Sequence, residues 1–195
     1  MIISHKHKFI FFHIPKCAGS SIFYGLCENL KYYNSESQNT VNDDIAILAT
    51  NNLKYSNSPI KQHLSFLSVK SCFKIDLDDY YKFCFVRNPW DRLVSYYVYQ
   101  NIEIPFDEYA KNNRDCQFNW IKKNKKESGV DFVGKTENLQ EDFDKVCDSI
   151  GIDKFELSHR NKSQRSAYQD YYNEESKRSV FKNYKKDIDL FNYKF

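Results

Sequence analysis

The sequence predicts an α/β fold in which a central, mostly parallel sheet is flanked by helices. Two runs, residues 9–14 and 82–86, have the continuity expected of parallel strands that are covered on both faces. Each run ends in a polar loop, and apolar residues at helical spacing follow each loop. Strand–loop–helix units of this kind are typical of open α/β sheets.

The composition is that of one globular domain. The chain has 195 residues, of which 41% are hydrophobic and 17% aromatic, enough for a substantial core. Five glycines and four prolines leave little room for flexible linkers, so we expect a single domain over residues 1–195. The net charge of +3 is too small to indicate nucleic-acid binding, although it suits the local binding of a polyanionic small molecule.

The six cysteines are spaced as independent thiols, with neither C-x-x-C pairs nor a compact disulfide framework. The sequence therefore predicts neither a metal site nor disulfide bonds, and it favours a reducing compartment. The first apolar run is too short for a signal peptide or a membrane span. We expect a cytoplasmic protein without a transmembrane segment; a peripheral position at the inner membrane surface and the oligomeric state stay open.

The residues after the first strand have the properties of an anion-binding loop. The sequence Pro15-Lys16-Cys17-Ala18-Gly19-Ser20-Ser21 ends the apolar run and supplies small residues that a ligand can approach closely. Its last amides would begin a helix, where unpaired N–H groups and the helix dipole attract anions, and Lys16 adds a positive charge. Alone, the pattern fits a plain strand-to-helix turn equally well.

The next elements are predicted from spacing and composition. A helix at residues 20–30 carries one apolar stripe, a polar loop follows at 31–43, and a short helix is expected at 43–53. The sequence Lys61-Gln62-His63-Leu64-Ser65-Phe66-Leu67 then presents a lone histidine, His63.

A second strand-to-helix junction lies at Arg87-Asn88-Pro89-Trp90-Asp91-Arg92-Leu93-Val94-Ser95-Tyr96-Tyr97. Asn88 is a good N-cap and Pro89 a good first helical residue. Arg87 therefore lies at the carboxyl end of a central strand, where open α/β sheets bind ligands. Ser95 falls within two turns of the helix start and could share an anion with Arg87.

The second half of the chain predicts shorter elements. These are helices at residues 106–110 and 118–121 and a strand at 131–134. Asn138-x-x-Glu141 resembles a capping box, and Gly151 ends the helix that it starts. Residues 158–165 form a basic loop, and a helix at 173–184 leads to an aromatic C-terminus that we expect to pack on the sheet.

In this order, the motifs resemble those of sulfotransferases that use 3′-phosphoadenosine 5′-phosphosulfate (PAPS). Residues 15–21 are similar to the 5′-phosphosulfate loop of that family, and residues 87–97 to its 3′-phosphate motif. Further matches lie at residues 61–67, 134–139, 161–163 and 184–195. The closer likeness is to the carbohydrate branch, which includes the heparan 2-O-sulfotransferases and related bacterial proteins. The resemblance covers nearly the whole chain and implies a P-loop NTPase-like sulfotransferase fold.

The resemblance also implies the residues that bind the donor. Lys16 would neutralise the bridging oxygen as the sulfuryl group leaves, while the loop holds the 5′-phosphate. The implied donor-binding residues are Lys16, Cys17, Ala18, Gly19, Ser20 and Ser21 in the loop, Arg87 and Ser95 at the 3′-phosphate, and Lys162, Ser163 and Arg165 closing over the nucleotide. Cys17 stands where the family more often has Thr or Ser, so one hydroxyl contact would be missing while the backbone amides remain.

The implied reaction is transfer of a sulfuryl group to a hydroxyl of a carbohydrate or glycoconjugate, with 3′-phosphoadenosine 5′-phosphate as the other product. His63 matches the catalytic histidine of the 2-O-sulfotransferases and would take the hydroxyl proton during in-line attack on sulfur. A hydrogen-bonded structural role is the alternative for His63, and His13 and His159 are weaker candidates for the base. No metal and no nucleic-acid partner are implied.

Two other functions compete with this one. A P-loop phosphotransferase needs Gly-x-x-x-x-Gly-Lys-Ser/Thr, but here Lys16 precedes Gly19, and the second strand ends in Arg87 instead of a metal-binding aspartate. A catalytically inactive nucleotide-binding module is the other alternative, which the presence of Lys16, Arg87 and His63 disfavours. Nothing in the sequence indicates which sugar or hydroxyl is the acceptor.

Overall fold

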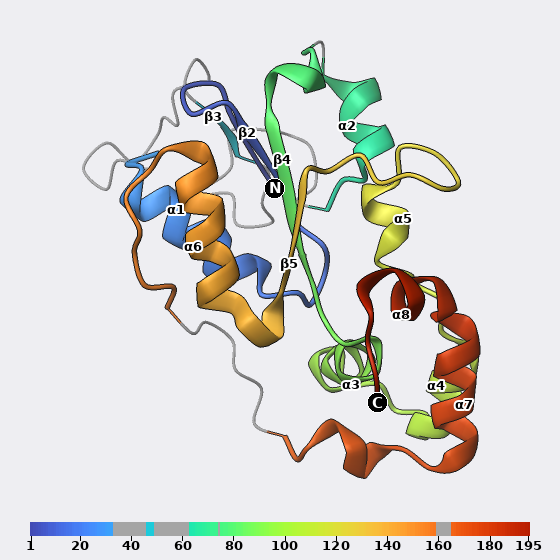
Figure 1. Ribbon diagram of the computed structural model, residues 1–195. Coiled ribbons are helices and arrows are strands. Elements are labelled where there is room, and N and C mark those ends of the chain that lie inside the picture. Colours follow the sequence, from blue (N-terminus) through green and yellow to red (C-terminus); the bar gives the residue numbers. More distant parts are fainter. Residues whose placement is uncertain (33–45, 49–62, 74, 159–164) are drawn as a thin grey trace. The chain divides into compact units, whose positions relative to one another are not determined.

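The computed structural model describes residues 1–32, 46–48, 63–73, 75–158 and 165–195, with backbone alone at 46–48 (Figure 1). The chain divides into two compact units. Unit 1 comprises residues 1–86 and 120–160, and unit 2 comprises residues 87–119 and 161–195. The single domain expected over residues 1–195 stays a prediction.

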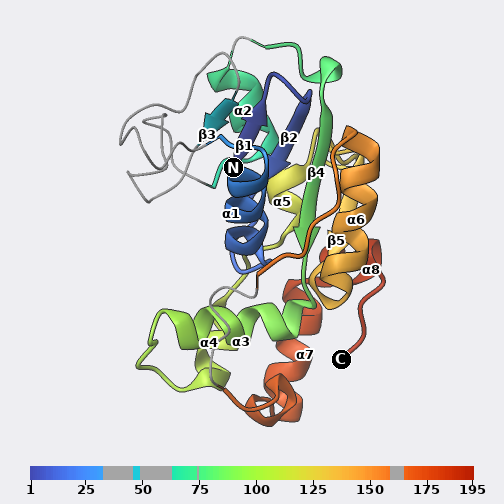
Figure 2. The same ribbon diagram turned by 90° about the vertical axis from the view of Figure 1, so that its left-hand side faces the viewer.

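Unit 1 contains a five-stranded sheet of order β3-β1-β2-β4-β5 (Figure 2). Its strands are β1 (Ile2–Ser4), β2 (Phe9–Phe12), β3 (Ala46–Leu48), β4 (Tyr81–Val86) and β5 (Phe132–Lys135). β2, β4 and β5 pair in parallel, whereas β1 is antiparallel to both of its neighbours. Four of the five described strands therefore run in one direction. The α/β class, the mostly parallel sheet and the strands expected near residues 9–14, 82–86 and 131–134 are confirmed.

The prediction of a helix at residues 43–53 is wrong for residues 46–48, the part of that segment that the structure describes. Residues 46–48 form β3, and Ile47 pairs with Ile3 of β1. A three-residue apolar run has no distinguishing period, and pairing with β1 satisfies its backbone groups. The remainder of that segment and residues 33–43 of the loop expected at 31–43 lie outside the described residues.

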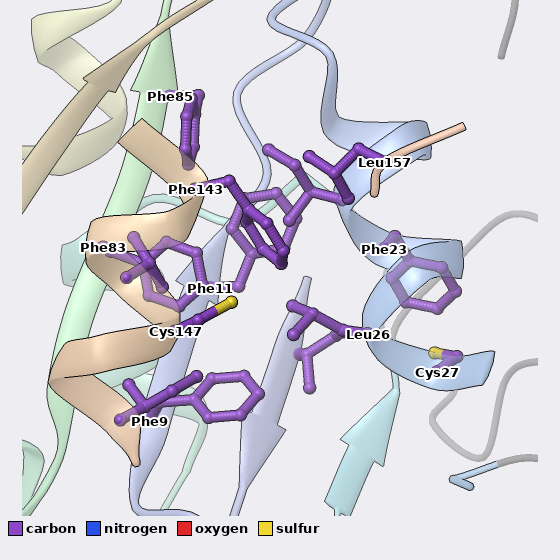
Figure 3. Close-up of a cluster of buried hydrophobic side chains, with 14 of the residues drawn as sticks. Phe9, Phe11, Phe23, Leu26, Cys27, Phe83, Phe85, Phe143, Cys147 and Leu157 are labelled. Atoms are coloured by element: carbon purple, nitrogen blue, oxygen red, sulfur yellow. The ribbon is translucent and has the colours of Figure 1, made fainter. Parts of the chain in front are cut away.

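The core of unit 1 lies between the sheet and two helices, α1 (Gly19–Asn29) and α6 (Leu139–Ile150), as Figure 3 shows. Alternate strand residues share one face of a sheet, so Phe9 and Phe11 of β2 join Phe83 of β4 in this core. Each fully buried large side chain contributes roughly 1.5–3 kcal/mol by leaving water. The core therefore fixes the end of β2, from which the predicted loop begins.

On the other face of β2, the aromatic ring of Phe12 packs on Phe66, with 6.0 Å between ring centroids. Phe66 begins helix α2 (Phe66–Cys72), whose N-cap residue Ser65 accepts a hydrogen bond from the Ser68 amide. A 3₁₀ turn, η2 (Leu77–Asp79), precedes β4. Packing on Phe12 thus holds the segment that follows His63 against the sheet.

Helix α6 ends as expected but begins differently. Gly151 adopts the left-handed conformation with φ 68°, which favours glycine. The capping box expected from Asn138 and Glu141 is wrong, because the Asn138 side chain makes no capping hydrogen bond. The chain enters the helix through a 3₁₀ turn, η3 (Thr136–Asn138), and Asp142 accepts a hydrogen bond from the Lys135 amide instead.

Unit 2 is helical. Its elements are α3 (Pro89–Tyr99), α4 (Phe106–Asn112), η4 (Tyr168–Tyr171), α7 (Glu174–Asn183) and α8 (Lys185–Phe191); α5 (Phe118–Ile121) spans the boundary between the units. The predicted N-cap Asn88, the helices expected at 106–110 and 118–121, and the helix expected at 173–184 are confirmed.

The C-terminal residue Phe195 packs within unit 2, and the expected packing of the terminus on the sheet stays a prediction. The ring of Phe195 contacts Trp90 of α3 and the rings of Tyr168 and Tyr172. The Asn88 side chain donates a hydrogen bond to the carbonyl of Lys194 at 2.7 Å, which directs the terminus to the start of α3. The terminus is therefore part of unit 2, beside the residues that follow Arg87.

Candidate functional site

The predicted site residues that the structure describes form two groups, one in each unit. The first, which we name the loop cluster, consists of residues 13–21 and His63 of unit 1. The second, the arginine cluster, consists of the predicted residues Arg87, Ser95 and Arg165 of unit 2 together with Asp91, which was not predicted as a site residue. Lys162 and Ser163 lie outside the described residues.

The loop after β2 turns through two left-handed residues that are not glycine. Lys16 has φ 66° and Ala18, the N-cap residue of α1, has φ 55°. This conformation costs roughly 1–2 kcal/mol for an L-residue, and such strain is concentrated at functional sites. Ala18 provides no side-chain cap, and no acidic residue lies in the first turn of α1. The positive end of the helix dipole is therefore not neutralised locally by a side chain.

Cys17 directs its thiol into the protein. The residue is 1% exposed, and its Sγ atom donates to the carbonyl of Pro15 at 3.5 Å. A ligand at this loop would consequently meet the backbone of Cys17. The thiol thus contributes to the packing beneath the loop.

Gly19 is required by the ring of His13. A Cβ atom on residue 19 would lie 1.9 Å from Cδ2 and 2.0 Å from Nε2 of His13. Separations below 3 Å do not occur for real Cβ atoms. The sequence suggests that this glycine admits a ligand, whereas the structure shows that it also admits a protein side chain.

His63 has a defined tautomer. Its Nδ1 atom lies 2.7 Å from the carbonyl oxygen of His13. Because a carbonyl oxygen only accepts, Nδ1 carries the hydrogen, and the lone pair of the neutral ring is on Nε2. The rings of His13 and Trp120 meet His63 edge to face, at 4.6 and 6.1 Å between centroids. A half-buried imidazole held in one tautomer is suited to act as a general base.

His13 itself is poorly suited to that role. It is 7% exposed, and its Nδ1 atom is buried without a hydrogen-bond partner in the described part of the chain. Burial lowers the pKa of His13 well below its ordinary value, and electrostatic interactions with the Met1 amino group and with His63 lower this pKa further. His13 is therefore neutral near pH 7. His159, the other weaker candidate, lies outside the described residues.

In the arginine cluster, two guanidinium groups share one carboxylate. Asp91 accepts from Arg87 Nε at 2.7 Å through Oδ2 and from Arg165 through Oδ1. Asp91 lies in the first turn of α3, whose N-cap Asn88 accepts hydrogen bonds from the amides of Trp90 and Asp91. Two positive charges and one negative charge leave the group with a net charge of +1, which attracts anions.

A buried polar network fixes the backbone of Arg87. Its amide donates to Gln117 Oε1 at 2.8 Å, and Gln117 Nε2 donates to its carbonyl at 2.8 Å. Asp187 of α8 in turn accepts from the amides of Gln117 and Phe118. Ser95, by contrast, is 4% exposed on α3. The structure thus brings Arg87 and Arg165 together on Asp91, while Ser95 is a buried residue of α3.

Some of these partners can be anticipated from sequence spacing, and others cannot. Asp91 follows Arg87 by four residues on a helix start, a spacing at which opposite charges meet. Gln117 and Trp120 were not predicted as site residues, because their contacts with Arg87 and His63 depend on the tertiary fold alone.

Unit 2 also contains a cavity of about 230 Å³. Its lining residues are Arg92, Leu93, Tyr96, Gln100, Tyr109, Asn113, Asp115 and Tyr184. Arg92 and Asp115 neutralise each other at 2.7 Å, and burial raises the phenol pKa values of Tyr96, Tyr109 and Tyr184. The cavity therefore has no net charge, unlike the arginine cluster.

The cysteines are structural where they are buried. All six lie within the described residues as thiols, and burial raises the pKa of Cys27 to about 12. Across the described ranges, no three or more His, Cys, Asp or Glu side chains form a group that could hold a metal ion. Of the helices in those ranges, none combines the length and apolar character needed to cross a bilayer.

Comparison with known proteins gives the family. An archaeal protein of Archaeoglobus fulgidus, described as "Uncharacterized protein", is 40% identical over 86 residues, which cover 38% of this chain and 71% of that protein. No solved structure matches the chain significantly. The family model described as "Sulfotransferase family" matches residues 1–194. The chain therefore belongs to the sulfotransferase family.

Proposed function

We propose that this protein transfers a sulfuryl group from PAPS to a hydroxyl of a carbohydrate acceptor. One observation carries the proposal beyond the family match. Within unit 1, an imidazole whose tautomer is fixed at Nδ1 belongs to the same cluster as a strained, lysine-containing loop at a helix N-terminus. A base and an anion-binding loop are the two components that sulfuryl transfer from a phosphosulfate requires.

The loop cluster would bind the phosphosulfate end of PAPS. The amides of residues 18–21 begin α1, and the dipole of an eleven-residue helix favours an anion there. Lys16 would place its ammonium group at the oxygen that bridges phosphorus and sulfur. The negative charge that develops on this oxygen during the reaction is the charge that a fixed cation stabilises.

The arginine cluster would bind the 3′-phosphate. Asp91 orients two guanidinium groups, and guanidinium geometry matches phosphate through pairs of N–H donors. Ser95 and, by resemblance, Lys162 and Ser163 would add hydrogen-bond donors. This phosphate distinguishes PAPS from ATP, so the arginine cluster would select the donor.

The proposed step is an in-line displacement at sulfur. Nε2 of His63 takes the proton of the acceptor hydroxyl while the hydroxyl oxygen forms its bond to sulfur. The bond between sulfur and the bridging oxygen breaks, and the electron pair remains on the 5′-phosphate beside Lys16. The products are a sulfate ester and 3′-phosphoadenosine 5′-phosphate, and the imidazolium returns its proton to water.

The carbohydrate acceptor is proposed from the resemblance to the carbohydrate branch, which includes the match at residues 61–67 around His63. The sugar and the hydroxyl position are left open. A P-loop phosphotransferase and an inactive nucleotide-binding module remain the competing functions.

Calorimetry distinguishes these functions. The protein should bind 3′-phosphoadenosine 5′-phosphate without added metal, and it should transfer radiolabelled sulfate from PAPS to members of a panel of polysaccharides. The proposal is overturned if the nucleotide does not bind at ~1 mM, where only about 4 kcal/mol of binding free energy is needed. Tight binding of ATP·Mg²⁺ in its place would indicate the phosphotransferase.

A further inference from the structure

We propose that His13 is the positioning residue of the catalytic base: its carbonyl group sets the tautomer of His63, and its ring sets the orientation of the His63 imidazole. The inference rests on the proposed function for its catalytic meaning. Three contacts of described residues carry it.

The first contact fixes His13 itself. Its ring stacks on Phe11 of the core, with 5.8 Å between centroids and 19° between planes. It also occupies the space that a Cβ atom on Gly19 would fill. His13 is therefore held between the sheet and the backbone at the start of α1, and its ring cannot move without displacing one of them.

The second contact is the hydrogen bond from His63 Nδ1 to the carbonyl oxygen of His13. A fixed backbone carbonyl selects the Nδ1–H tautomer and leaves Nε2 as the basic atom. Because His13 O and the His13 ring belong to one residue that packs on Phe11 and Gly19, the acceptor is as immobile as the ring.

The third contact is between the two imidazole rings, which meet at 4.6 Å and 68°. A hydrogen bond leaves a ring free to rotate about the bond axis, whereas a second ring against its face or edge restricts that rotation. The ring of His13 is neutral, so it does not repel the imidazolium that His63 becomes when it accepts a proton. The buried Nδ1 atom of His13 has no hydrogen-bond partner in the described residues, so this atom gives no hydrogen bond to His63 and the restriction comes from the shape of the ring.

The test compares two variants. In His13→Phe a flat, neutral ring remains, and in His13→Ala the ring is lost while the backbone carbonyl stays. We expect His13→Ala to lower kcat by ~10²-fold, the effect of a misplaced catalytic group, and to leave KM for the donor and the affinity for 3′-phosphoadenosine 5′-phosphate unchanged. His13→Phe should recover most of kcat.

Long-range ¹H–¹⁵N correlation spectra of histidine-labelled protein report the His63 tautomer without any substrate. The wild type should show a single tautomer with hydrogen on Nδ1, His13→Phe should keep it, and His13→Ala should show exchange between tautomers. An unchanged tautomer and an unchanged kcat in His13→Ala would overturn the inference. Equal loss of kcat in both variants, or loss of nucleotide affinity in His13→Ala, would also overturn it by assigning His13 to the structure of the loop.

These readouts separate the inference from the proposed function. If the expected tautomers are observed and the wild type transfers no sulfuryl group, the proposed function fails while the positioning of His63 by His13 stands. Should His13→Ala not fold, His13→Asn, which also lacks a ring, takes its place in every comparison with His13→Phe.

Discussion

The two clusters hold their functional side chains by different means. In the loop cluster the contacts of His13 are neutral and depend on shape: its ring fills the space beside Gly19, and its carbonyl accepts the hydrogen bond of His63. In the arginine cluster the contacts are ionic, since the carboxylate of Asp91 bridges two guanidinium groups.

This difference corresponds to two functions, proton transfer and anion binding. Proton transfer requires that the basic nitrogen be held at a defined position, and short-range packing contacts hold it there. Attraction of an anion falls off only gradually with distance, so a pair of oriented cations provides affinity over a wider range of positions. We therefore expect changes of shape in the loop cluster to reduce turnover, and changes of charge in the arginine cluster to reduce donor affinity.

The largest effect is expected from His63→Ala. Removal of a general base should lower turnover by ~10²–10⁴-fold and leave the affinity for 3′-phosphoadenosine 5′-phosphate unchanged. Steady-state kinetics and calorimetry measure the two quantities, and His7→Ala, another half-buried histidine of unit 1, is the control. Turnover at the wild-type rate would place the base elsewhere.

Arg87→Ala should show the opposite pattern. Loss of a charged hydrogen-bonding group costs about 1.5–3 kcal/mol, so nucleotide affinity should fall roughly 10- to 100-fold while kcat at saturating donor is kept. Arg178→Ala, at an exposed position on α7, is the matched control. A reduced kcat with unaltered affinity would remove the distinction between the clusters.

Gly19→Ala tests whether shape governs the loop cluster. The added methyl group would lie 1.9 Å from the His13 ring, and overpacking should lower the free energy of unfolding by ~1–3 kcal/mol. In a His13→Ala background the same substitution should cost less, because the ring is gone. Urea unfolding measures both costs, and equal costs in the two backgrounds would show that the ring does not require Gly19.

The smallest effect is a pH dependence of stability. The pKa of His13 is lowered in the folded state, so below pH about 6.5 the unfolded chain binds more protons and stability falls as pH falls. From pH 7.5 to 5.5 this group can lower the free energy of unfolding by at most about 1.4 kcal/mol. The lowered pKa of His7 adds to the slope in wild type and variants alike. His13→Phe should therefore reduce the loss seen by urea unfolding at the two pH values, and an equal loss in both proteins would contradict the assignment.

Local signals predicted the parts of the fold that depend on neighbouring residues. A continuous apolar run marked β2, and Asn88 followed by Pro89 marked the start of α3, because capping and strand burial act over a few residues. The capping box at Asn138 failed because the chain enters α6 through a 3₁₀ turn. The strand at 46–48 was not predicted because its pairing with β1 is a tertiary contact.

The same distinction between local sequence signals and tertiary contacts applies to the candidate site. Lys16, Gly19 and Arg87 were recognised from motifs, and a motif records residues that are adjacent in sequence. The contact between His13 and His63 joins residues 50 positions apart, and the ion pair between Asp91 and Arg165 joins residues 74 positions apart. No spacing rule covers such distances, so the positioning partners were found only in the folded chain.

We propose that the arginine cluster binds the 3′-phosphate of the donor nucleotide. Calorimetry with 3′-phosphoadenosine 5′-phosphate and with adenosine 5′-phosphate, which lacks the 3′-phosphate, tests it most directly. We expect at least roughly tenfold tighter binding of the 3′-phosphorylated nucleotide, about 1.4 kcal/mol, and loss of that difference in Arg87→Ala. Equal affinities of the wild type for the two nucleotides, or a difference that survives Arg87→Ala, would contradict it.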